Sequence, residues 1–370
     1  MQHRLLPQMI ILLAACLLLA APAAAQDRLS ADLVTAEAHD QPQRQQIRDY
    51  AAQWLEVLLQ GQPEQIPQAR SRLLQPLNME PSDSFLSIYA PALQPEDDGA
   101  DGPVLSQGLQ SDKPLATRLN TIIVLTNLPG QQSIDLLVDA LEDPNPAVRY
   151  WAAKAIGRLA GENQFTTQRR QDLLDTLLTR LNEDETAAVC QQILLAAGEI
   201  DATRMLEILN DRLNQIARKP GQSVLAEQVA LRQFYLDLAA AGDADPDLVE
   251  ELGRTALRYL RLAARELDSQ RVGGQQADIY AGTVRVADNA LRFVHGNRNS
   301  SVDHPGSLDS LINSENWQTV LQRADQWERA LQASPFNFSQ EELSIPAPPQ
   351  DEEETDDQEA DPNAGQAPQE

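Results

Sequence analysis

The stretch from residue 131 to 160, QQSIDLLVDALEDPNPAVRYWAAKAIGRLA, constrains the fold more than any other part of the chain. It carries two amphipathic helical patterns, separated by a turn that contains Pro144 and Pro146. A single helical hairpin cannot bury its apolar face by itself, so it must pack against similar neighbours. The segment therefore predicts an all-α fold in which helical hairpins stack side by side.

The hairpin pattern recurs along the chain. Ala147-Val148-Arg149 begins one helix, and Ala188-Val189-Cys190 begins another forty-one residues later. Residues 118–128 match residues 149–159 at an offset of thirty-one. A period near forty residues is typical of arrays of helical pairs. Amphipathic spacing predicts further helices over 42–59, 65–76, 133–142, 167–182, 203–218, 224–241, 247–267, 276–294 and 317–332.

Residues 137–160 resemble a HEAT repeat. Asp143 ends the first helix, Arg149 lies at the start of the second, and a run of small residues follows where helices approach closely. The resemblance implies a right-handed α-solenoid of HEAT-like helical hairpins, and it is strongest over residues 131–160 and weaker as far as residue 334. It also implies a ladder between turns, formed by Asp143 and Arg149 in a structural role. Because Cys190 replaces the arginine in the next unit, the ladder is predicted to break after one rung.

Composition shifts divide the chain into five predicted parts. These are a signal peptide (1–25), a flexible linker (26–41), N-terminal helices followed by a loop rich in proline, glycine and aspartate (42–113), the HEAT-like domain (114–334) and a disordered acidic tail (335–370).

The N-terminus has the layout of a secretory signal peptide. His3 and Arg4 precede an apolar run, and small residues end at Ala25, after which cleavage is expected. This predicts an exported bacterial protein, periplasmic or extracellular, with no transmembrane segment after signal removal. A lipobox ending at Cys16 is the alternative, and it would give a lipid anchor at that residue.

The negative net charge of the chain limits the classes of molecule that it can bind. The formal net charge is -26, and no lysine or arginine follows Arg329. Phosphate backbones are bound by clustered basic residues, so nucleic acid is excluded as a partner. A carboxylate-rich end of this kind repels itself and buries little apolar surface, which predicts disorder from residue 335 onward.

One basic feature stands out in this acidic chain. Four arginines recur at steps of four, three and four residues, so they form one stripe along a helix: Arg254, Arg258, Arg261 and Arg265. Such a stripe would suit a carboxylate-rich partner, including the protein's own tail. A solvated, salt-bridged helix face is the alternative. Two aromatic residues, Tyr150 and Trp151, are interpreted as packing residues.

The residues that could support catalysis are sparse. After the signal segment the histidines are His39, His295 and His304, and they form no metal pair at helical spacing. We therefore predict no catalytic residues, no metal site and no cofactor. Residues 295–307 collect polar side chains of the kind that hydrolases use, including Ser300, Ser301 and Asp303, which leaves a hydrolase-like enzyme as an alternative.

These observations predict a non-enzymatic scaffold or adaptor. Its helical-repeat surface would bind an unidentified protein or cell-envelope component. Two alternatives are kept, which are the same scaffold anchored by lipid through Cys16 and the enzyme based on the loop at 295–307.

Overall fold

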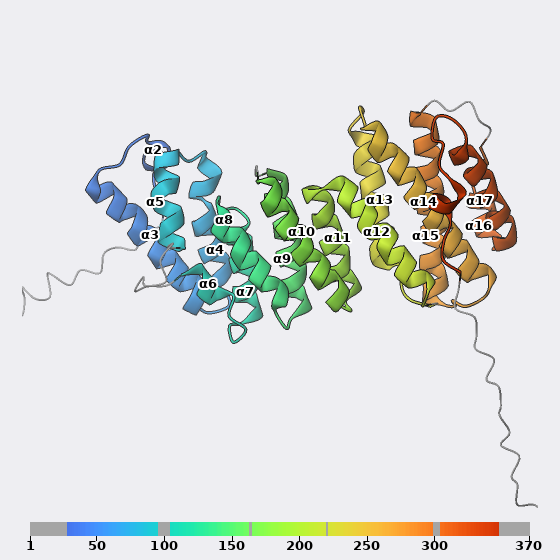
Figure 1. Cartoon of the computed structure of the whole chain (residues 1–370). Coiled ribbons are helices and arrows are strands. Elements are labelled where there is room, and N and C mark those ends of the chain that lie inside the picture. Colours follow the sequence, from blue (N-terminus) through green and yellow to red (C-terminus); the bar gives the residue numbers. More distant parts are fainter. Residues whose placement is uncertain (1–27, 95–103, 163–164, 220, 299–303, 348–370) are drawn as a thin grey trace, which may run out of the picture. The chain divides into compact units, whose positions relative to one another are not determined.

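The computed structural model describes residues 28–94, 104–162, 165–219, 221–298 and 304–347, and these residues form helices without a strand (Figure 1). The chain divides into two compact units, residues 1–205 and 206–370, and the division falls inside one helix. The predicted signal peptide and its Cys16 lie outside the described residues. The acidic residues after 350 lie outside them as well.

Unit 1 consists of helices that pack against their neighbours in sequence. In chain order they are α2 Ala31–Thr35, α3 Gln41–Gln60, α4 Ile66–Leu74, η1 Pro76–Met79, α5 Asp83–Leu93, α6 Leu105–Gly108, α7 Leu115–Leu125, α8 Gln131–Asp139, η2 Ala140–Glu142, α9 Pro146–Glu162, α10 Thr167–Glu183 and α11 Ala187–Ile200. Helix α12, Ala202–Ala217, spans the division between the units.

The predicted hairpin arrangement is present in unit 1. Helix α8 packs on α9, and α10 packs on α11, so each pair forms a hairpin. The second helices α7, α9 and α11 also contact one another in succession. Apolar side chains on these helices are fully buried, among them Ile122, Ile156 and Ile193. The second helices therefore form the continuous core that a lone hairpin could not provide.

The second helices approach closely at Gly157. A Cβ atom at this position would lie 2.9 Å from the Cα atom of Ala196 on α11. Backbone atoms cannot move aside as the end of a flexible side chain can, so the contact requires glycine. The run of small residues around it, which includes Ala152 and Ala153, is buried. This is the close approach that the sequence predicts for these residues.

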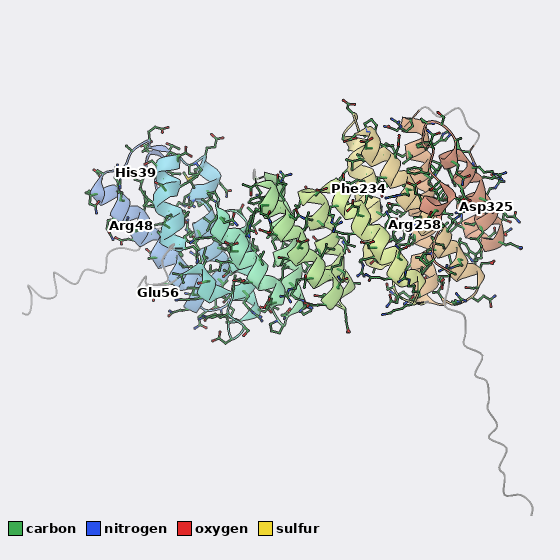
Figure 2. All side chains as sticks on the ribbon, viewed as in Figure 1. His39, Arg48, Glu56, Phe234, Arg258 and Asp325 are labelled. Carbon is green, nitrogen blue, oxygen red and sulfur yellow. The ribbon has the colours of Figure 1, made fainter. Side chains whose placement is uncertain are left out.

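The N-terminal region is more ordered than predicted. Residues 28–41 were expected to be a flexible linker, but α2 buries Leu33 and Val34. His39 is also buried, and its Nε2 lies 2.7 Å from the carbonyl oxygen of Leu33. Figure 2 labels His39 in this part of unit 1. The linker prediction is wrong for these residues because two adjacent apolar side chains suffice to fix a short helix against its neighbours.

The predicted loop at 77–113 contains a further helix. Phe85 and Tyr89 on α5 are completely buried, and Ser82 caps the helix by accepting a hydrogen bond from the Phe85 N–H at 3.1 Å. Pro91 lies inside α5, which ends two residues later. The prolines suggested irregular structure, but Pro91 removes only one backbone hydrogen bond, and the buried side chains of Phe85 and Tyr89 hold the helix in place.

Unit 2 contains longer helices. They are α13 Leu225–Ala240, α14 Pro246–Asp268, α15 Gln275–Asn297, α16 Asp309–Asn313, α17 Trp317–Gln332 and α18 Gln340–Leu343. Helix α14 lies at the centre and contacts α13, α15, α17 and α18. Tyr259 and Trp327 fill the core, and the Tyr259 hydroxyl donates to the carbonyl of Leu209 at 2.8 Å.

The chain stays ordered beyond the predicted end of the domain at residue 334. Residues 335–347, which we call the C-terminal strap, follow α17 and cross α14 (Figure 1). Leu343 is fully buried and Phe336 nearly so. The predicted start of the disordered tail at residue 335 is therefore wrong for these residues, because apolar anchors hold them against unit 2 despite the neighbouring carboxylates.

We predict that Gly157→Ala lowers the free energy of unfolding by about 1–3 kcal/mol, because the added methyl group collides with the α11 backbone. Urea unfolding followed by circular dichroism measures this change.

Gly198→Ala on α11 is the matched control. Its added Cβ atom would lie 3.7 Å from the Met205 side chain, an ordinary contact. Because alanine favours the helix over glycine, this change should stabilise by up to about 1 kcal/mol. Equal effects of the two substitutions would contradict the proposed close approach.

Candidate functional site

Arginine–aspartate pairs join successive turns of unit 1. Arg118 on α7 donates from Nη1 to the Asp143 carboxylate at 2.6 Å, and both residues are buried. Arg149 on α9 donates from Nε to the Asp184 carboxylate at 2.5 Å. Each arginine thus reaches the aspartate of the following turn, and the pairs form a ladder with two rungs.

The pairing differs from the sequence prediction. Arg149 contacts Asp143 through the backbone, because its Nη1 donates to the Asp143 carbonyl at 2.8 Å. The carboxylate of Asp143 is instead held by Arg118, which the offset of thirty-one residues places at the same position of the preceding repeat. At Cys190 the thiol lies 3.1 Å from the carbonyl oxygen of Asp184 in its own turn. A cysteine side chain is too short to reach a further turn, so the ladder ends after two rungs.

The aspartates also shape their own turns. Asp143 accepts a hydrogen bond from the Asn145 N–H at 2.7 Å, and Asp184 accepts one from the Thr186 N–H at 2.8 Å. Burial acts to raise the pKa of Asp184, but hydrogen bonds from Arg149 and Thr186 outweigh it and hold the pKa below its ordinary value. These contacts give the ladder a structural role.

A polar groove of about 570 Å³ lies over these turns. Arg149 and Arg180 line it together with several carboxylates. Both arginines are already paired, Arg149 with Asp184 and Arg180 with Glu142 and Glu183. The groove therefore belongs to the structure of the turns, and we do not assign a ligand to it.

A second, smaller groove on unit 1 has a different character. It measures about 140 Å³ and is lined by side chains of α7 and α9: Ile123, Thr126, Asn127, Trp151, Lys154, Ala155 and Arg158. Trp151 is 37% exposed, although large apolar side chains are mostly buried. The Lys154 ammonium lies 4.9 Å from the centre of the indole ring, within the range of a cation–π contact.

The described residues that line this groove, which we call the Trp151 groove, include no carboxylate. Residues 115–127 and 146–161, which include α7 and nearly all of α9, contain no aspartate or glutamate. The whole chain has 55 acidic residues in 370, so a stretch of this combined length would carry about four on average. Lys154 therefore presents positive charge on one of the second helices of an acidic protein.

The sequence interpretation of Trp151 as a packing residue is wrong. Its neighbour Tyr150 is half-buried and lies edge-on to it, with ring centres 5.9 Å apart, but the indole itself is exposed. Trp151, Lys154 and Arg158 are spaced by three and four residues, so they fall on one face of α9. That spacing, combined with the missing carboxylates, is the sequence signal that identifies the groove.

The predicted arginine stripe lies on one face of α14 in unit 2, where Figure 2 labels Arg258. Arg254 pairs with Glu251 on the same helix. The other three donate to backbone carbonyls of the C-terminal strap: Arg258 to Ser344 at 2.9 Å, Arg261 to Leu343 at 3.3 Å and Arg265 to Pro346 at 2.7 Å. The stripe thus holds a segment of its own chain through main-chain oxygens.

The two histidines of the predicted polar loop lie together. The ring centres of His295 and His304 are 4.4 Å apart, and His304 stacks on Trp327 at 5.2 Å. The His304 Nδ1 donates to the carbonyl of Pro305 at 2.7 Å. Nearby, burial raises the pKa of Asp288, whose carboxylate accepts from the Leu308 N–H at 3.3 Å.

The remaining members of the loop, Ser300, Ser301 and Asp303, lie outside the described residues. A serine hydrolase based on this loop would use a serine hydroxyl as its nucleophile. In the part of the chain that the structure describes, no group of three or more histidine, cysteine, aspartate or glutamate side chains is placed to bind a metal ion. Within the same part, no helix is both long and apolar enough to cross a bilayer.

Successive helical hairpins with stacked second helices define an α-helical repeat protein. Residues 102–167 match a family model of HEAT repeats. The chain therefore contains HEAT repeats, and the match includes residues 131–160, where the sequence resemblance is strongest. Comparison with curated proteins and with solved structures gave no match.

We predict that Asp184→Asn lowers the free energy of unfolding by about 2 kcal/mol near pH 7, because it leaves Arg149 without its charged partner. The folded-state pKa of Asp184 is lowered, so its contribution is present above the unfolded pKa of about 3.9 and is lost as the pH falls through the folded pKa. The difference between variant and parent should therefore shrink in acid, which urea unfolding at several pH values measures.

Asp135→Asn is the matched control. Asp135 also pairs with an arginine of the next repeat, Arg169, but its side chain is 54% exposed. Exposed pairs contribute little, so this change should cost less than about 1 kcal/mol. A pH-independent effect of Asp184→Asn would contradict the electrostatic role of the rung.

Proposed function

We propose that the protein is a non-enzymatic interaction scaffold that binds a protein partner at the Trp151 groove. The observation that carries the proposal is the exposed indole of Trp151, which lies beside Lys154 in a groove whose lining residues include no carboxylate. Exposed tryptophan side chains are enriched at binding hot spots. The HEAT repeats support the scaffold role, because stacked helical pairs present an extended binding surface.

The groove indicates the chemistry of the partner. A volume of about 140 Å³ accommodates one or two side chains and is too small for a large cofactor. An apolar or aromatic side chain would pack on the Trp151 ring, and a neighbouring carboxylate would face Lys154. The partner is therefore an acidic segment with an apolar anchor, on a protein or another envelope component.

Export is part of the proposal, and it is supported by the sequence alone. The charged start, apolar run and small residues before Gln26 are typical of a secretory signal. The lipid-anchored alternative uses Cys16 instead. Mass spectrometry of the mature protein separates the two, since we predict an N-terminus at Gln26. An acylated Cys16 at the N-terminus would instead support the lipid-anchored alternative.

The binding proposal is tested with random peptides displayed on phage and selected against residues 26–370. We predict that enriched peptides combine aspartate or glutamate with an aromatic or aliphatic residue. Trp151→Ala should weaken binding at least tenfold, about 1.4 kcal/mol, because the apolar anchor loses its platform. Lys154→Glu should weaken it as well, and added salt should reduce binding to the parent. Fluorescence anisotropy with a labelled peptide measures each affinity.

The control is Arg170→Glu. It reverses the charge of an exposed residue on α10, the first helix of the hairpin formed by α10 and α11. This variant should bind like the parent, because α10 does not line the groove. Selected peptides without acidic residues, or peptides that bind equally well to Trp151→Ala, would overturn the assignment of the binding surface.

A further inference from the structure

The C-terminal strap binds unit 2 as a peptide ligand would. Phe336 and Leu343 bury their side chains, and the strap contacts both α14 and α17. Between and after these anchors the main chain of the strap makes hydrogen bonds to α14 and α17. The Phe338 N–H donates to the carbonyl of Leu331 at the end of α17, at 3.1 Å.

The backbone of the strap explains why arginines hold it. Ser344 has φ -76° and ψ 158°, which are polyproline II values. This conformation makes no internal hydrogen bonds, so its carbonyl oxygens need outside donors. Pro346 favours an extended conformation at the preceding residue and has no N–H of its own. The guanidinium groups of Arg258 and Arg265 supply donors to Ser344 and Pro346.

The arginines are positioned by residues that do not belong to the strap. Arg258 donates to the side-chain oxygens of Asn210 and Asn214 on α12, each at 2.6 Å. Arg261 is held by Asp325 and Glu328 on α17, at 3.0 Å and 2.5 Å. The donors therefore keep their orientation independently of the strap, as expected of a pre-formed binding site.

Arg265 is oriented in the same way, since its Nε donates to the buried Glu266 at 3.1 Å. Hydrogen bonds from Ser339 hold the pKa of Glu342 on the strap below its ordinary value, and the charge of Arg254, the fourth member of the stripe, makes a smaller contribution in the same direction. The Leu343 side chain, one carboxylate and three carbonyl oxygens thus meet a surface that is built by α12, α14 and α17.

We propose that this surface is a peptide-binding groove, occupied here by the protein's own C-terminal strap. It would bind in trans a segment of the same chemistry, which is a short helical turn with carboxylates that ends at a leucine, followed by extended residues and a proline three residues after the leucine. Recognition through main-chain carbonyls and proline-favoured geometry is a known mode of peptide binding. The strap is joined to unit 2 only at residue 334, so it can leave the groove without breaking a helix. This proposal is independent of the Trp151 groove.

The test uses a fluorescein-labelled peptide of residues 335–350 and fluorescence anisotropy. We predict no measurable binding to the full chain, because the groove is occupied. Leu343→Asp in the full chain should release the strap and allow micromolar binding, and a chain that ends at Ser334 should bind likewise. Adding Arg258→Gln and Arg265→Gln to either chain should weaken binding at least tenfold.

Two controls accompany these measurements. Arg285→Gln removes an arginine of α15 that pairs with Asp309 and does not contact the strap, so affinity should be unchanged. A peptide with aspartate in place of Leu343 should not bind. Circular dichroism establishes that each variant is folded.

The proposal is overturned if the folded Leu343→Asp chain fails to bind the peptide, or if the parent chain binds it equally well. It is also overturned if Leu343→Asp and the chain ending at Ser334 both unfold. The strap would then be an obligatory part of the core and could not exchange with another segment.

Discussion

The close approach of α9 and α11 at Gly157 is the contact on which unit 1 depends. With no side chain at this position, the two second helices lie near enough for Arg149 at the start of α9 to reach Asp184 in the next turn. Packing and the charged rung therefore act on the same pair of helices. Because one face of α9 is buried in this stack, the opposite face, with Trp151, is the face that remains available to a partner.

The arginines on α14 of unit 2 are paired within the chain. Lys154 of unit 1 is exposed, whereas the arginines of α14 hold carbonyl oxygens of the C-terminal strap and carboxylates of α17. Guanidinium groups suit this task because they donate several hydrogen bonds in a fixed plane and stay charged when partly buried. Burial lowers the pKa of Arg258, but the ordinary pKa of an arginine lies so far above 7 that the group stays charged at neutral pH.

Periodic features of the sequence were sufficient to predict most helices. The predicted helix at 317–332 coincides with α17, and that at 167–182 is one residue shorter than α10. Short ordered segments were missed because their stability depends on distant partners. Leu33 and Val34 hold α2, and Phe336 and Leu343 anchor the strap among carboxylates and prolines, which are typical of disorder. The exposure of Trp151 was also missed, since amphipathic spacing does not reveal where the stack of helices ends.

The most direct test of the stacked repeat is native-state hydrogen exchange on the full chain under increasing urea. If α7, α9 and α11 share one core, their slowest amides should open in a single cooperative step with the same free energy. Asp184→Asn should then lower that free energy equally in all three helices. Separate opening free energies for the three helices, or a loss of protection confined to α9 and α11, would contradict the account.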